Sequence, residues 1–96
     1  MKYEIYQLDG RDKNNHGKIF MPWRIVRDEF SITDYKLVYT GDIETGNDII
    51  DTLDELFEIF NLRHPEDFRG HSLSVSDVIQ INDRLYYCDS CGWVEL

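Results

Sequence analysis

Cysteine and proline are scarce in this chain, which has two of each among its 96 residues. Two cysteines are too few for the disulfide scaffold of a small secreted domain. No apolar run has the length of a signal peptide or of a membrane span. These absences predict a soluble, cytoplasmic protein that does not bind membranes. Residues 1–96 are short enough to form a single domain with a modest core.

Basic residues are missing from residues 37–62, which carry seven acidic side chains. Residues 1–36 hold seven Lys or Arg and six Asp or Glu, and residues 63–96 hold three and six, so the central stretch supplies most of the net charge of −9. A field of this sign repels the phosphates of nucleic acid. We therefore expect no direct binding to nucleic acid.

The hydrophobic pattern alternates between strand and helix spacing and predicts an α+β fold. Apolar spacing of three and four indicates helices over residues 21–30 and 48–61, the second strongly amphipathic. Strand signals lie at residues 2–8, 18–20, 35–41, 77–82, 84–89 and 93–96. We expect an antiparallel or mixed β-sheet with the main amphipathic helix packed on one face. The last strands form a C-terminal β-hairpin or meander through a tight turn at Asn82 and Asp83.

The main helix follows a predicted turn at residues 43–48. Asn47 or Asp48 is suited to cap its start, and Thr52 with Glu55 has the spacing of a capping box that would start it later. Its apolar stripe is expected to face the core and consists of Ile49, Ile50, Leu53, Leu56, Phe57 and Phe60.

The polar face of this helix carries Asp51, Asp54, Glu55 and Glu58 and has no base among them. Side chains one turn apart lie roughly 6 Å from each other, comparable to the spacing of phosphates along a nucleic-acid strand. The row could imitate DNA and engage a basic partner surface. The alternative is an ordinary solvated face, which every surface helix needs and which is the commoner case.

A second candidate is the run GHSLSVSD at residues 70–77. Its polar and turn-forming members are Gly70, His71, Ser72, Ser74, Ser76 and Asp77. Ser, His and acid are the components of a nucleophilic triad, and Tyr87 and Asp89 could lie nearby if the last strands fold back. Hydroxyls so close in sequence more often bond the neighbouring backbone, and no nucleophile-elbow motif surrounds them. We expect a structural turn, with a small enzyme or ligand-binding site as the alternative.

Cys88 and Cys91 form a C-x-x-C pair between two predicted strands. Two thiols are half of a zinc site, and neither His64 nor His71 has a partner at metal-ligand spacing. The pair also lacks the helix N-terminus that lowers a thiol pKa in redox motifs. We expect no metal and no cofactor, with a zinc-linked dimer as a remaining alternative.

Several segments together resemble the YodL-like family of small bacterial domains: YEIYQL, YKLVYTGDI, LDELFEIFN and HPEDFRGHSLSVSDVIQIN, followed by RLYYCDSCGWVEL. The most specific part runs from Phe68 to Val78. The resemblance implies a domain of Gram-positive bacteria, often encoded on conjugative or phage-like mobile elements, with no catalytic residues to carry over. The family pattern does not call for cysteine at positions 88 and 91.

Taken together, these features predict a non-enzymatic protein-interaction module. The expected partner is a protein with a basic surface, engaged by the acidic helix, in a regulatory or counter-defence role on a mobile element. Its identity cannot be read from the sequence, and a homodimer is compatible with it.

Overall fold

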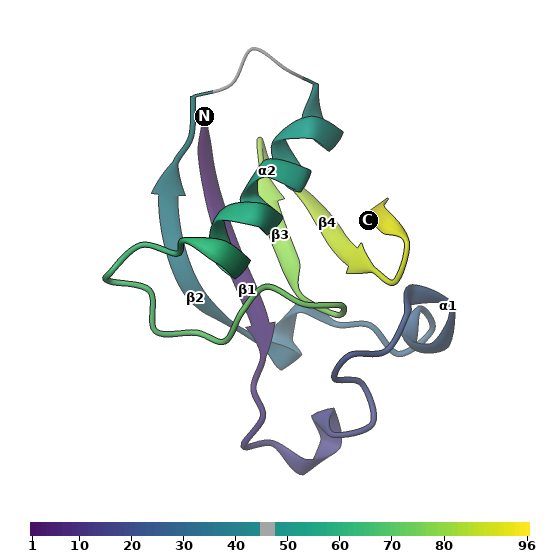
Figure 1. The fold of residues 1–96 in the computed structure, drawn as a ribbon. Helices are drawn as coiled ribbons and strands as arrows, with labels where there is room; N and C mark the ends of the chain where they lie inside the picture. The colour runs from purple at the N-terminus through teal and green to yellow at the C-terminus, as the bar shows by residue number, and fades with distance from the viewer. Residues whose placement is uncertain (45–47) are drawn as a thin grey trace.

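Residues 1–44 and 48–96 are described by a computed structural model of an α+β domain (Figure 1). The predicted turn at residues 43–48 and the cap candidate Asn47 fall partly or wholly outside the described residues. The elements of the described residues are β1 (Lys2–Leu8), a 3-10 turn (Lys13–Asn15), α1 (Trp23–Val26), a 3-10 turn (Ile32–Asp34), β2 (Tyr35–Asp42), α2 (Ile49–Leu62), β3 (Val78–Ile81), β4 (Arg84–Asp89) and β5 (Gly92–Glu95).

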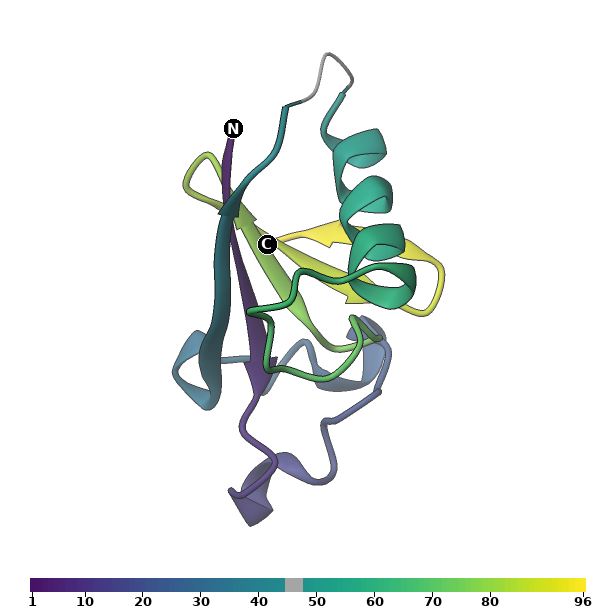
Figure 2. The same ribbon diagram turned by 60° about the vertical axis from the view of Figure 1, so that its left-hand side comes forward.

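The described strands form one antiparallel sheet in the order β2-β1-β3-β4-β5. Strand β1 pairs with β2 and with β3, so the first strand of the chain lies inside the sheet. Strands β3, β4 and β5 form the predicted C-terminal meander (Figure 2). The predicted fold class is therefore confirmed.

Alternation along the strands gives the sheet two apolar faces. On one face, Ile5, Ile79 and Tyr86 belong to the main core, which α2 covers (Figure 1). On the other face, Val78 and Tyr87 pack against Val26 of α1 in a smaller cluster. A sheet covered on both sides explains why β3 reads as an almost continuous apolar run.

Helix α2 begins where the sequence places a cap. The Asp48 carboxylate accepts a hydrogen bond from the Asp51 N–H at 2.9 Å, so Asp48 is the N-cap and the later start at Thr52 is not used. A carboxylate at this position also complements the positive end of the helix dipole.

The apolar stripe of α2 is only partly covered, which corrects the expected packing. Leu53, Leu56 and Phe60 are fully buried, whereas Ile50 is 46% exposed and Phe57 is 39% exposed. At 100° per residue, Ile50 and Phe57 lie roughly 65–90° from the centre of the buried stripe. The sheet therefore contacts the centre of the stripe and leaves this flank uncovered.

The hairpin between β3 and β4 forms as predicted. Asn82 and Asp83 both have positive φ, at 53° and 65°, as a two-residue type I′ turn requires. Asparagine and aspartate tolerate this left-handed region better than most residues. The local sequence therefore fixes the register of β3 against β4.

Two predictions for the N-terminal half are wrong. Residues 18–20 form a turn, because the N–H groups of Lys18 and Ile19 both bond to the Asn15 carbonyl oxygen. The helix expected over residues 21–30 is limited to α1 and continues as a turn. None of the described helices has the length and apolar composition needed to cross a bilayer.

Candidate functional site

The GHSLSVSD segment packs against the end of β1. The Asp77 side chain is only 1% exposed. Its Oδ2 accepts hydrogen bonds from the Ser74 N–H at 2.8 Å and from the Gln7 amide at 3.1 Å. The Asp77 N–H in turn bonds to the Ser74 carbonyl oxygen. Ser74 and Asp77 thus form the reciprocal contacts of a capped turn.

Two of the three serine hydroxyls of this segment, those of Ser74 and Ser76, contact the main chain. Ser74 Oγ donates to the Ser72 carbonyl oxygen at 2.8 Å. Ser76 Oγ accepts from the N–H of Phe20, a residue distant in sequence, at 3.0 Å. Ser76 has a φ of 87°, and its carbonyl oxygen accepts from the Tyr35 hydroxyl at 2.6 Å. These bonds tie the turn before β3 to the N-terminal half of the chain.

Gln7 links the two sides of the segment. Its Oε1 accepts from the His71 N–H at 3.2 Å, and its Nε2 donates to the His71 carbonyl oxygen at 2.8 Å and to Asp77. The Gln7 side-chain amide thus bonds both the N–H and the carbonyl oxygen of His71, as the backbone of a neighbouring strand would. It holds the His71 backbone against β1.

The His71 Nδ1 has two polar neighbours of opposite character. The Ser72 carbonyl oxygen at 2.7 Å can accept from a protonated Nδ1, and the Gln7 Nε2 at 3.3 Å can donate to an unprotonated one. Nε2 faces Asp77 Oδ1 at 3.8 Å, too far for a hydrogen bond. Among the described residues, no serine hydroxyl is hydrogen-bonded to this ring.

Burial raises the pKa of Asp77 to about 8, and the hydrogen bonds from Ser74 and Gln7 oppose that shift. The desolvation of a charge inside the fold outweighs two donors. Asp77 is therefore largely protonated at neutral pH, and its contact with His71 is not a fixed ion pair.

The two residues proposed to join the segment from the last strands have other partners. The Tyr87 hydroxyl donates to the Met21 carbonyl oxygen at 2.6 Å. Asp89 Oδ1 accepts from the Trp23 N–H at 3.0 Å, which positions the start of α1. Both side chains thus anchor the N-terminal segment to β4 instead of meeting His71.

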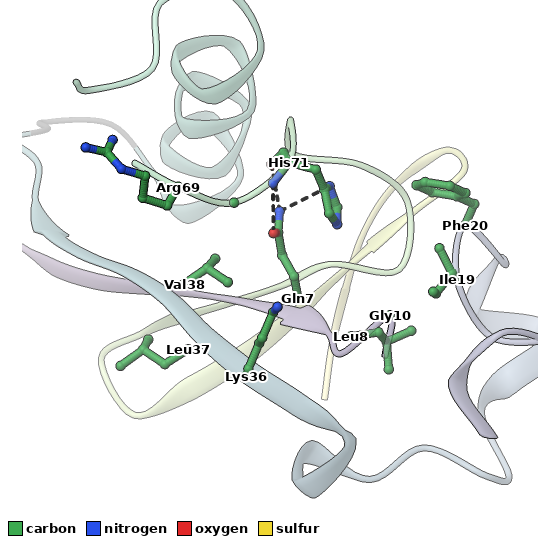
Figure 3. Close-up of a pocket in the computed structure, with 11 residues that line it drawn as sticks. Gln7, Leu8, Gly10, Ile19, Phe20, Lys36, Leu37, Val38, Arg69 and His71 are labelled. Carbon is green, nitrogen blue, oxygen red and sulfur yellow. Dashed lines mark hydrogen bonds between the residues drawn. The ribbon is translucent and has the colours of Figure 1, made fainter. Parts of the chain in front are cut away.

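A cavity of about 620 Å³ opens beside His71 (Figure 3). The segment contributes Gly70 and His71 to its wall, whereas its serines and Asp77 do not line it. Gln7 lies at the back, where its amide meets the His71 main chain. The space is therefore a cleft at the end of the sheet, and the hydroxyl cluster of the segment does not face it.

The predicted acidic face is exposed on α2. Asp51, Asp54 and Glu58 are exposed, and Glu55 is half-buried. Asp54 accepts a hydrogen bond from Trp93 Nε1 at 3.0 Å, so one of the four carboxylates is engaged by β5. The other three show no hydrogen bond or ion pair to another described side chain.

An apolar flank borders this acidic face. Phe57 and Trp93 meet edge to face with ring centroids 6.5 Å apart, and the exposed Ile50 lies two helical turns before Phe57 on the same side of α2. A hollow of about 220 Å³ lies beside them and is lined in part by Asp54 and Asp89. The exposed surface of α2 therefore combines carboxylates with aromatic and aliphatic side chains.

The two cysteines differ in environment. Cys88 is buried in β4, and burial raises the pKa of its thiol to about 12. Cys91 is exposed in the turn before β5, and both thiols are free. Within residues 1–44 and 48–96, no three potential metal ligands of the His, Cys, Asp or Glu type come together.

Sequence reasoning missed several residues that shape these surfaces. Gln7 carried a detectable signal, since it continues the inward alternation of Tyr3 and Ile5 as a polar residue at a core position. Lys36 and Arg69 carried none, because the cavity that they share is formed by segments far apart in the chain.

Comparison with known proteins identifies a family and no close relative. The chain matches the family model of the YodL-like domain over residues 2–96. No curated protein and no solved structure matches it.

Proposed function

The chain belongs to the YodL-like domain family, and we propose that it is a non-enzymatic protein-interaction module whose α2 outer face docks a basic partner. The observation that carries the proposal is the composition of that face: exposed carboxylates next to exposed apolar side chains. Its occupant is a basic amphipathic segment, such as a helix with Lys or Arg on one side and aliphatic residues on the other.

The charge pattern supports a basic partner. Asp51, Glu55 and Glu58 are not neutralised by bases of their own helix, since residues 37–62 contain no Lys or Arg. Like charges one turn apart repel by a few tenths of a kcal/mol per pair. A basic partner would relieve this repulsion on binding, and the negative field would steer its approach.

The apolar flank indicates that the partner contributes apolar side chains as well as positive charge. Ile50 and Phe57 are large side chains left uncovered, and Trp93 extends the same flank on β5. Aromatic side chains at the centre of an interface contribute much of its affinity, whereas rim charges mainly set the rate and the specificity. We expect the partner to bury this flank and to place its bases over the carboxylates.

A surface that normally contacts nucleic acid has the required bases. A partner of that type would make the domain a regulatory or counter-defence protein of a mobile element, in keeping with the row of carboxylates on α2. A pull-down from the native host would identify the partner. Whether the α2 face binds a basic segment is tested separately, with peptides.

The test uses two labelled peptides of about 18 residues, one with Lys and Leu at amphipathic helical spacing and one of Lys alone. Binding is followed by fluorescence anisotropy at about 50 mM and about 300 mM salt. We expect the amphipathic peptide to bind about tenfold more tightly than oligolysine and to weaken at high salt.

The helix variant Asp51→Asn, Glu55→Gln, Glu58→Gln tests the location of binding and spares the Asp54–Trp93 bond. Its matched control neutralises three exposed acids elsewhere: Asp28→Asn, Glu29→Gln, Glu66→Gln. We expect the helix variant to lose most of the affinity and the control to retain it. Equal losses in both variants would reduce the interaction to net charge and overturn the proposal.

A further inference from the structure

The cavity beside His71 has the size and position of a small-molecule site. It lies at the end of β1, between the first residues of β2 and the segments around residues 19–20 and 69–71 (Figure 3). Its volume of about 620 Å³ falls within the range of ligand pockets, roughly 300–1,000 Å³. The surface discussed above lies on α2, and none of its residues lines this cavity.

The lining combines cationic and apolar side chains and contains no acid. The bases are Lys36 and Arg69, with His71 beside them, and the apolar wall includes Leu8, Phe20 and Val38. The chain has 19 acids against 10 bases, so a cavity that gathers bases alone departs from its overall composition. Such a lining favours a ligand that carries a negative charge on an apolar body.

Lys36 is positioned to bind the negatively charged group of such a ligand. It extends from β2, and Figure 3 shows its amino group directed toward Gln7 and the His71 segment. Among the described residues it makes no hydrogen bond or ion pair, and the nearby Asp9, whose pKa is lowered first by Arg11 and to a smaller extent by Lys36, is held by Arg11. An ammonium that no described residue binds directly can neutralise a carboxylate or phosphate group.

Arg69 lines the cavity from the loop that faces β2, and Figure 3 shows its guanidinium turned away from Lys36 and the His71 ring. Its Nη1 donates to the main-chain carbonyl oxygens of Glu66 and Phe68 at 2.5 and 3.3 Å, which fixes the side chain on its loop. Arg69 therefore adds positive charge at the rim, whereas Lys36 is the cation directed into the cavity.

Phe20 provides an exposed aromatic surface at the mouth. Its ring is 61% exposed and meets His71 edge to face at 6.2 Å. Its φ of 65° is rare for a bulky residue, and the bond from its N–H to Ser76 Oγ holds that conformation. Strain of this kind persists where the surroundings impose it and is concentrated at binding sites.

We propose that this cavity binds a small organic anion, with its carboxylate or phosphate on Lys36 and its planar apolar body against Phe20. Leu8 and Val38 complete the apolar wall. The Gln7 amide, already bonded to His71 and Asp77, forms a rigid back wall and is not a contact for the charge.

The experiment compares three probes that share one ring: indole-3-acetate, 3-indoxyl phosphate and the neutral indole-3-acetamide. Amide chemical shifts of the ¹⁵N-labelled protein are followed during titration. We expect saturable shifts at Gly10, Phe20, Gly70 and His71, and at least one anion binding about tenfold more tightly than the amide. A preference between the two anions identifies the carboxylate or the phosphate as the recognised group.

Two charge-neutralising variants locate the anion. Lys36→Gln is expected to abolish the preference for the anions over the amide, whereas Lys2→Gln, with the same charge change at the other end of the sheet, preserves it. The proposal is overturned by equal affinity for anion and amide, by shifts confined to other residues, or by no saturable shift up to about 10 mM probe. The shift map serves as the second measurement if Lys36→Gln fails to fold.

Discussion

Asp77→Asn is expected to remove the pH dependence that a buried carboxyl gives to this fold. Among the described residues, Asp77 is the one acidic residue that is buried, and burial raises its pKa from 3.8 to about 8. Asparagine is a neutral isostere. Its side-chain oxygen can still accept from the Ser74 N–H and from Gln7, so the variant keeps the two contacts and loses only the ionisation.

The direction in which stability changes with pH follows from the linkage between protonation of Asp77 and folding. A raised pKa in the folded state means that the folded protein holds the proton while the unfolded chain releases it. The stabilising contribution is complete below about pH 4 and is lost as the pH rises toward about 8. Each pH unit in that window changes the free energy of unfolding by about 1.4 kcal/mol, so from about pH 5 to about pH 7 the wild type loses about 3 kcal/mol relative to Asp77→Asn.

Urea denaturation of both proteins across this range measures the difference. We expect near-equal stability below about pH 4, and a variant that is more stable by about 1.5 kcal/mol at about pH 5 and by more at about pH 7. The desolvation argument is refuted if Asp77→Asn is the less stable protein at neutral pH, since the hydrogen bonds would then outweigh burial.

Two further predictions concern the backbone. Gly70→Ala places a Cβ 2.5 Å from Gln7 Oε1 and 2.9 Å from the Phe68 ring, so we expect a loss of about 1–3 kcal/mol in urea denaturation. Gly10→Ala meets nothing within 4 Å and should stay within about 0.5 kcal/mol; equal effects in the two variants would mean that the predicted contact is absent. Asp83→Gly relieves a side chain held at φ 65° and should stabilise the hairpin by about 0.5 kcal/mol, seen as a higher melting temperature. Asn82→Gly replaces a residue already favoured at its turn position, and a gain as large as that of Asp83→Gly would contradict the assigned turn type.

The sequence alone predicted the elements whose signals are local. The strands over residues 84–89 and 2–8, the turn at Asn82 and Asp83, and the Asp48 cap depend on alternation, turn chemistry and capping. Each of these involves residues within a few positions of one another, so the local pattern carries the information.

The tertiary structure decided what depends on distant contacts. Residues 18–20 looked like a strand, but they pair with no strand of the described sheet, and the Asn15 carbonyl oxygen holds them in a turn. Phe57 fitted the helical stripe, and only the placement of the sheet under α2 leaves it uncovered. Periodicity reports that a side chain is apolar, whereas its burial depends on the partner surface.

The local sequence of GHSLSVSD determined that its polar groups could hold a turn, and Ser74 and Asp77 bond each other's backbone within three residues. Which groups meet the N-terminal half was decided by folding alone. Gln7 reaches His71 across 64 positions, and Lys36 and Arg69 share a cavity because β1 pairs with both β2 and β3. Hydrogen bonds and cavities of this kind arise from strand order, which no short stretch of sequence encodes.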